Sequence, residues 1–197
     1  MKTKFKTAFM DVASTFAKLS SARRLQVGAI VVKDERIISI GYNGMPSGWD
    51  NECERVEFVG DNEQLESPDK MMKLGFTRSN VGWVRTTTKP EVLHAEMNAL
   101  MKLARSNESG LDSTLFVTHA PCLDCAKGIY QAGIKEVYYA ESYRSTAGIE
   151  FLIKCGISVE QIKKQSETYG SKGQGKRYKK VTKRNTYLQE YKNAKLT

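Results

Sequence analysis

The chain has 197 residues, 40% of them hydrophobic, which suits one domain with a sizeable core. It contains no apolar run of about 18 residues that could span a membrane, and its first residues lack the apolar stretch of a signal peptide. Four cysteines do not make a disulfide framework, which favours a reducing compartment. We therefore expect a cytoplasmic protein without a membrane partner.

The formal net charge of +9 is concentrated in one segment. Residues 163–197 carry 11 Lys or Arg and 2 Asp or Glu, whereas residues 1–162 carry 20 residues of each sign. This contrast divides the chain into a neutral domain, residues 1–162, and a basic C-terminal tail, residues 163–197. Basic residues interleaved with aromatic ones can bind single-stranded nucleic acid, but we favour a solvated tail or an oligomer contact.

The first third of the chain predicts a helix and a hairpin. Apolar residues recur at helical spacing between Phe5 and Leu19, which indicates an amphipathic helix that ends near Ser20. Residues 26–32 and 36–41 are β-rich runs close enough to pair as a hairpin.

Residues 45 to about 90 form an insertion with little apolar periodicity and strongly segregated charge. Residues 50–69 hold eight acidic residues against Arg55, and residues 70–89 hold five basic residues and no acidic one. We expect most of this insertion to be a partly ordered, charged surface loop.

The second half alternates helices and strands. The pattern predicts helices from His94 to about Asn107 and near 147–155, and strands at 114–118, 136–140 and near 158–162. The strand at 114–118 leads directly into Pro121 and the cysteines that follow. Ligands of open α/β sheets bind at this carboxyl end of the strands.

Cys122 and Cys125 are the strongest metal-ligand candidates. If a helix begins near Pro121, both thiols can aim at one point, and the helix dipole there favours thiolates. Two thiolates with the imidazole of His94 suit zinc; the other histidine, His119, lies in a strand-like run and is a weaker candidate. Three protein ligands leave a fourth position open, as in catalytic zinc sites.

Glu96 is the candidate proton carrier for such a site. In a regular helix its side chain would point about 200° away from that of His94, so the two can share a site only where a helix starts. Pro90 upstream and helix-forming residues downstream of Glu96 permit such a start.

These motifs match the H-x-E…P-C-x-x-C signature of zinc deaminases, and the chain resembles the cytidine deaminase superfamily. Within that superfamily it is most similar to the deoxycytidylate (dCMP) deaminases over roughly residues 5–160. The further segments that carry this similarity are Gln26-Val27-Gly28-Ala29-Ile30-Val31-Val32, Gly41-Tyr42-Asn43-Gly44-Met45-Pro46-Ser47-Gly48, His94-Ala95-Glu96-Met97-Asn98-Ala99 and Gln131-Ala132-Gly133-Ile134-Lys135.

The resemblance implies a three-layer α/β/α fold with a mixed sheet of about five strands. It implies hydrolytic deamination of dCMP to dUMP, in which zinc activates water and Glu96 transfers protons. It also implies a homo-oligomer, often a hexamer, activated by dCTP and inhibited by dTTP. Some relatives bind a second zinc in the insertion; here Cys53 is its one eligible ligand, so we do not expect that site.

The resemblance also assigns candidate substrate contacts. Asn43 matches an asparagine that contacts the sugar hydroxyl, although its position beside glycine also suits a turn residue. Tyr143 matches a tyrosine that helps to hold the nucleotide, and backbone groups near Ala120 are expected to orient the base. Arg23 and Arg24 are either solvated residues or a grip on the 5′-phosphate.

Two other functions stay open. One is a deaminase that acts on a base within DNA or RNA, including tRNA adenosine, which the basic tail favours. The other is a non-catalytic nucleic-acid-binding module with a structural zinc, which a fourth protein ligand would favour.

Overall fold

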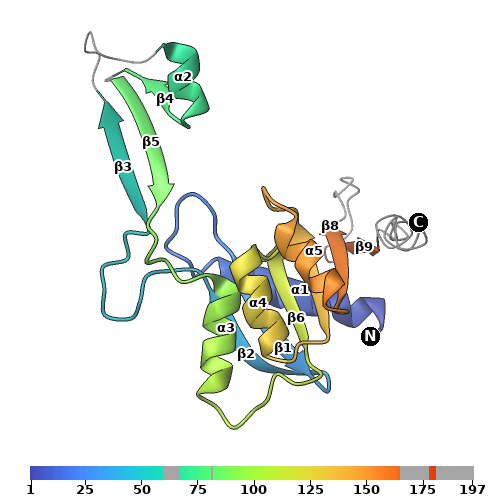
Figure 1. Ribbon diagram of the computed structural model, residues 1–197. Coiled ribbons are helices and arrows are strands. Elements are labelled where there is room, and N and C mark those ends of the chain that lie inside the picture. The colour runs from blue at the N-terminus through green and yellow to red at the C-terminus, as the bar shows by residue number, and fades with distance from the viewer. Residues whose placement is uncertain (60–66, 81, 165–177, 181–197) are drawn as a thin grey trace, which may run out of the picture.

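The computed structural model describes residues 1–59, 67–80, 82–164 and 178–180, and its body is built on one mixed sheet (Figure 1). The strand order is β2-β1-β6-β7-β8-β9. β1 pairs antiparallel with β2 and β6, whereas β6, β7 and β8 are mutually parallel. The strands are β1 (Gly28–Lys33), β2 (Arg36–Tyr42), β6 (Thr114–His119), β7 (Glu136–Glu141), β8 (Ser158–Lys164) and β9 (Tyr178–Lys180).

Helices cover both faces of this sheet. α1 (Thr3–Ala17) covers one face, where Met10 packs against Phe116 and its neighbours. α3 (Ala95–Ala104), α4 (Leu123–Gln131) and α5 (Ala147–Lys154) cover the other, where Leu100, Ile129 and Leu152 join one buried cluster. The predicted three-layer α/β/α fold with about five strands in the sheet is thus confirmed, with the short β9 added at the edge. Within the described part of the chain, no helix is long and apolar enough to cross a membrane.

The strand directions bring four loops to one edge of the sheet. β6 and β7 are parallel, so their carboxyl ends at His119 and Glu141 lie side by side. Because β1 is antiparallel to β6 and β2 is antiparallel to β1, the segment before Gly28 and the segment after Tyr42 reach the same edge. All the site residues predicted from the sequence lie on or next to these loops.

Two glycines allow close packing behind this edge. A Cβ on Gly41 of β2 would lie 2.1 Å from the carbonyl oxygen of Ala95, so only glycine lets the first turn of α3 lie directly on β2. A Cβ on Gly148 of α5 would lie equally close, at 2.1 Å, to the carbonyl oxygen of Pro121. The close packing fixes the start of α3 and the segment that leads into α4.

The insertion forms an arm that projects from the body (Figure 1). We use "the arm" for β3 (Glu54–Val59), α2 (Pro68–Lys73), β4 (Thr77–Ser79) and β5 (Gly82–Thr88). Its antiparallel sheet has the order β3-β5-β4, and α2 packs on it through a small buried cluster. That cluster consists of Met71, Phe76 and Trp83, with Val59 partly buried beside it.

The expectation of a partly ordered, charged loop over most of residues 45–90 is therefore wrong for the arm. Its two longer strands pair along their whole length, and one ion pair joins them, between Glu57 of β3 and Arg85 of β5.

The predicted tail, residues 163–197, lies largely outside the described residues. β8 continues into it as far as Lys164, and β9 pairs antiparallel with β8. The rest of the tail, including its basic and aromatic pattern, is not described, so its role and the domain boundary at residue 162 stay predictions.

Candidate active site

His94 occupies the N-cap position of α3. Its backbone is extended, with φ −72° and ψ 151°, and α3 begins at the next residue. The segment before it is held by a bridge in which Gly44 and Leu93 exchange two backbone hydrogen bonds. Asn98 adds a third tie by donating to the carbonyl oxygen of Tyr42 at 2.7 Å. His94 thus lies at a helix start, the condition on which a shared site with Glu96 depended.

Cys122 occupies the equivalent position in α4. It is the N-cap residue, also with an extended backbone, and Cys125 lies in the first turn that follows. Pro121 therefore precedes the N-cap instead of starting the helix, which corrects the predicted helix start. The two thiols still converge, because an N-cap side chain and a first-turn side chain both lie over the end of the helix.

His94, Cys122 and Cys125 come together as one metal-ligand set. Their ligand atoms all lie within 4.8 Å of one another. His94 Nδ1 is 3.6 Å from Cys122 Sγ and 3.3 Å from Cys125 Sγ. Tetrahedral zinc with ordinary bond lengths would place such nitrogen and sulfur atoms roughly 3.6 Å apart. The residues fit a zinc ion, and within the described residues no other group of this size is found.

Glu96 lies beside this set but is buried, with 4% of its surface exposed. Burial raises the pKa of its carboxyl group to about 7, against the opposing effects of its own backbone N–H and of His94. The side chains of Glu96 and Cys125 are within hydrogen-bonding reach of each other. A carboxyl group with such a pKa can both accept and release a proton near neutral pH.

The two thiols differ in acidity. Hydrogen bonds from Cys125 and His94 lower the pKa of the Cys122 thiol to about 4. The hydrogen bond to Cys122 and burial raise the pKa of the Cys125 thiol. One thiolate is therefore already stabilised by the protein, and the second needs a cation such as zinc to lose its proton near neutral pH.

Asn43 lies next to the metal-ligand set, because its neighbour Gly44 is bridged to Leu93, which precedes His94. Its side chain is 8% exposed and engages the segment before β1. Its Nδ2 donates to the carbonyl oxygen of Leu25, and its Oδ1 accepts from the N–H of Val27, both at 2.8 Å. The amide is thereby held in one orientation.

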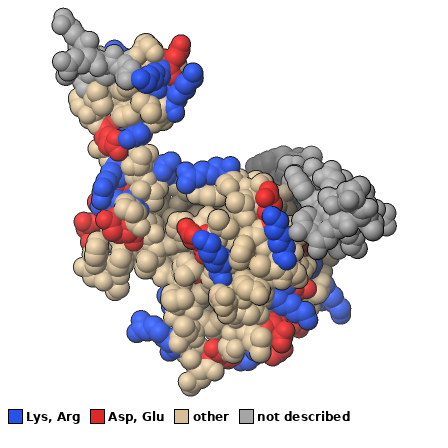
Figure 2. Space-filling view, viewed as in Figure 1, with Lys and Arg blue, Asp and Glu red and all other residues tan. Residues whose placement is uncertain are grey.

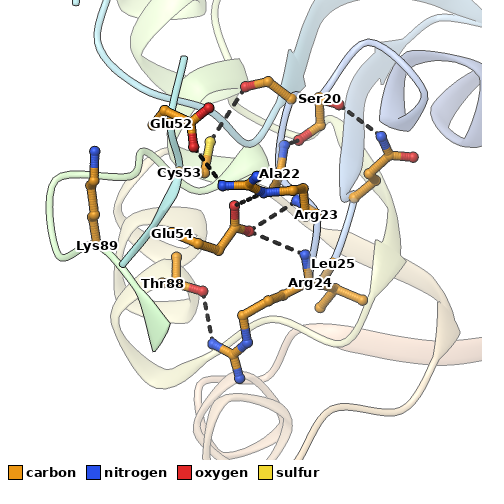
Figure 3. A network of polar contacts seen from close by, with 12 residues as sticks. Ser20, Ala22, Arg23, Arg24, Leu25, Glu52, Cys53, Glu54, Thr88 and Lys89 are labelled. Atoms are coloured by element: carbon orange, nitrogen blue, oxygen red, sulfur yellow. Dashed lines mark hydrogen bonds and ion pairs between the residues drawn. The ribbon is translucent and has the colours of Figure 1, made fainter. Parts of the chain in front are cut away.

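Arg23 and Arg24 lie in that same segment, but their guanidinium groups differ (Figure 3). Arg23 is ion-paired with Glu52 and lies 3.7 Å from Glu54 Oε2. Arg24 donates to the hydroxyl of Thr88 at 3.0 Å. In the described part of the chain no carboxylate forms an ion pair with Arg24, so none of the described acidic residues neutralises its charge.

Ala120 and Tyr143 follow the adjacent parallel strands. Ala120 is buried, and its N–H donates to the carbonyl oxygen of Glu141 at 2.8 Å, so this N–H is already occupied within the protein. Tyr143 is half-buried two residues beyond β7, with the Arg144 guanidinium 5.4 Å from its ring centre. His119 lies outside the metal-ligand set, where burial lowers the pKa of its imidazole against the effect of Glu141.

The residues that sequence reasoning missed are those that hold the loops. Glu54 and Thr88, at the base of the arm, contact Arg23 and Arg24, and nothing in their local sequence predicts this. Gly41 could have been found, since glycine inside a β-rich run indicates close backbone approach.

The fold and the site together define a zinc-dependent deaminase. A sequence model described as "cytidine and deoxycytidylate deaminase zinc-binding region" matches residues 3–141, and the chain belongs to that family. The resemblance suggested by the sequence motifs is confirmed.

Individual relatives point to one branch of the family. Deoxycytidylate deaminase of Enterobacteria phage T4 is 32% identical over 175 residues, which cover 80% of this chain and 89% of the relative. The human deoxycytidylate deaminase is 35% identical over 166 residues, covering 78% of this chain and 77% of that protein. A crystal structure of dCMP deaminase from the cyanophage S-TIM5, in complex with dCMP and dUMP, is 42% identical with a TM-score of 0.64, covering 82% of this chain and 98% of that one.

Proposed function

We propose that the protein catalyses the zinc-dependent hydrolytic deamination of dCMP to dUMP and ammonia, and so supplies dUMP for thymidine nucleotide synthesis. One observation carries the proposal. His94, Cys122 and Cys125 converge at two helix starts, with the buried Glu96 beside them. The similarity to the cyanophage enzyme, whose structure holds dCMP and dUMP, supports the choice of nucleotide.

In this proposal His94, Cys122 and Cys125 hold the zinc ion. Bound by these two thiolates and the imidazole, zinc would supply Lewis-acid activation of a water molecule for attack on C4 of the cytosine ring. Glu96 accepts the proton of that water, donates a proton to N3 of the ring, and assists the departure of ammonia. Its pKa of about 7 suits both directions of transfer.

The remaining candidates bind the nucleotide. Asn43 contacts the sugar hydroxyl through the hydrogen-bonding capacity that its two backbone contacts leave over, since an amide offers two donors and two acceptor lone pairs. Ala120 presents its carbonyl oxygen to the base, and Tyr143 closes the site beyond β7. Of the two arginines, we assign Arg24 to the 5′-phosphate, because Arg23 is already paired with carboxylates.

A substrate panel tests the proposal. The zinc-loaded protein is offered dCMP, dCTP, deoxycytidine and a cytosine-containing single-stranded oligonucleotide, and ammonia release is measured for each. We expect turnover of dCMP alone or by a wide margin. Turnover of the oligonucleotide alone would overturn the proposal and make the basic tail part of the substrate site.

We further propose, from the family resemblance, that the enzyme is a homo-oligomer, with a hexamer as one candidate state, activated by dCTP and inhibited by dTTP. Sedimentation with and without dCTP, run beside rate measurements with each effector, tests both statements. A monomer under both conditions, with rates that neither effector changes, would contradict them.

A further inference from the structure

Glu54 makes an unusual contact at the base of the arm (Figure 3). It is the first residue of β3, and its side chain is only 1% exposed. Its Oε1 accepts the backbone N–H groups of both Arg23 and Arg24, at 2.9 and 3.1 Å. Two successive backbone N–H groups that converge on one carboxylate oxygen form an anion-binding concavity, and this one is filled by a side chain of the protein itself.

The second oxygen of Glu54 is buried without a hydrogen-bond donor among the described residues. The Nε of Arg23 lies 3.7 Å from this oxygen. The carboxylate is therefore held through Oε1 and through its proximity to Arg23.

The strand residue opposite Glu54 completes the contact. Glu54 pairs with Thr88 of β5, and Thr88 accepts the hydrogen bond from the Arg24 guanidinium. The first residue pair of the arm therefore holds both the backbone and the side chain of Arg24. Figure 2 shows acidic and basic side chains gathered where the arm meets the body.

Asn43 holds the other end of the same segment. Its amide contacts Leu25 and Val27, directly after Arg24, so residues 23–27 are fixed by Glu54 at one end and by Asn43 at the other. A shift of the segment at the Glu54 end would change where the Arg24 guanidinium lies, and the Asn43 contacts would limit how far the shift spreads toward the zinc site.

We infer that Glu54 is a positioning residue for the 5′-phosphate of the nucleotide: it holds the Arg23–Arg24 backbone so that Arg24 is presented to the phosphate. The inference rests on the proposed function. It makes the base of the arm part of nucleotide binding, although the arm itself projects away from the body. A change at Glu54 should weaken binding of the phosphate without changing how the reacting base is held. Glu96 and the metal ligands lie in α3 and α4 or at the N-caps of these helices, outside residues 23–27.

The test separates phosphate binding from general damage. Glu54→Ala, Glu54→Gln and the control Glu57→Ala are prepared as zinc-loaded full chains. Glu57 lies on the same strand and is also paired with an arginine, but that pair, with Arg85, lies within the arm. Binding of dUMP and of deoxyuridine is measured by calorimetry, and kcat and KM are measured with dCMP.

For Glu54→Ala we expect the Kd of dUMP and the KM of dCMP to rise about 10-fold or more, with kcat within about threefold of the unsubstituted protein. Deoxyuridine, which lacks the phosphate, binds as before. Glu54→Gln can still accept both N–H groups but without charge, so its loss is smaller, about threefold, and it keeps the inference testable if the alanine variant fails to fold. Glu57→Ala leaves all values unchanged.

Three outcomes would overturn the inference: equal weakening of dUMP and deoxyuridine, no weakening of either, or tighter dUMP binding because the released Arg23 is the phosphate ligand. Failure of the proposed function is a separate result, since the unsubstituted protein would then not turn over dCMP at all.

Discussion

The edge of the central sheet and the arm differ in how much packing lies behind them. The helices that carry the metal-ligand set rest on a cluster of 14 buried side chains, several of them fully enclosed. Among its described residues the arm has a cluster of three buried side chains, Met71, Phe76 and Trp83, and it exposes more than half of the surface of Val56 and Phe58.

This difference indicates which part of the molecule can hold functional groups in exact positions. Metal ligands must be held to a fraction of an ångström, and only a well-packed core supplies that. The described residues of the arm form a much smaller core, and contacts with the body lie at its base, where Cys53, Glu54 and Thr88 meet Ser21, Arg23 and Arg24. Substitutions in each part can test this division between a densely packed body and an arm with a small core.

The largest effect is expected from Cys125→Ser in the body. Serine offers no thiolate at a position that is 1% exposed, so zinc content should fall from about one ion per chain to less than about a tenth, and activity should be lost with it. Metal analysis of the purified protein measures this. Cys155→Ser, which changes a cysteine outside the set, should keep its zinc; a full zinc complement in Cys125→Ser would remove Cys125 from the ligands.

Glu96→Gln should abolish most turnover while leaving zinc in place. The amide has the shape of the carboxyl group but cannot carry the proton, which costs about 10²- to 10⁴-fold in kcat. Steady-state rates with dCMP and metal analysis are measured together. Glu91→Gln serves as the matched control, because Glu91 pairs with Arg55 and not with the metal-ligand set. Near-normal turnover of Glu96→Gln would refute the proton-carrier assignment.

The zinc site could be predicted from sequence because each part of it is local. The spacing of Cys122 and Cys125 follows from one turn of helix, and the spacing of His94 and Glu96 requires a helix start, which the structure has. The alternation of helices and strands likewise yielded the layered fold, since each buried run is a continuous stretch of sequence.

The arm and the contacts of Glu54 could not be predicted in the same way. β3 and β5 lack the continuous apolar runs of the strands in the central sheet, and their pairing joins residues such as Glu57 and Arg85 that are 28 positions apart. Glu54 contacts Arg23 across 31 positions, and no local pattern marks a glutamate that will fill a backbone concavity. The segregated charge of the insertion was interpreted as a solvated loop, and a single ion pair of it, between Glu57 and Arg85, joins the two strands.

Trp83→Ala should unfold the arm and spare the body. Among the described residues of the arm Trp83 is one of three that form the buried cluster, and removing it costs about 3 kcal/mol or more of local stability, a large loss for so small a unit. Hydrogen exchange should show lost protection within residues 54–88 and unchanged protection in β1 and β6. Trp49→Ala, which changes a tryptophan that is 58% exposed, should alter neither. Unfolding of the body together with the arm would disprove the division.

Gly41→Ala should destabilise the body by about 2–3 kcal/mol. The added methyl group would lie 2.1 Å from the Ala95 carbonyl oxygen and 2.6 Å from the Ala99 nitrogen, so α3 must move away from β2. Chemical denaturation measures the free energy of unfolding. Gly44→Ala is the control, since a Cβ there meets no atom within 4 Å, and equal stability of the two variants would contradict the packing argument.

Lys6→Met should have the smallest effect and should lower the free energy of unfolding by about 1 kcal/mol. This loss should depend on pH. Burial alone would lower the pKa of the Lys6 ammonium group, but hydrogen bonds with Tyr138 and Glu160 outweigh it and raise the pKa above its ordinary value of 10.5. A raised pKa means that the folded state holds this proton more tightly than the unfolded state. The contribution to stability is therefore fully present below pH 10.5 and is lost as pH rises through the folded-state pKa.

The free-energy difference between the unsubstituted protein and Lys6→Met should be constant from pH 7 to about 9 and should shrink above about 10.5. Lys4→Met, which changes an exposed lysine on the same helix, should show no such trend; a difference that grows with pH would reverse the sign and refute the account.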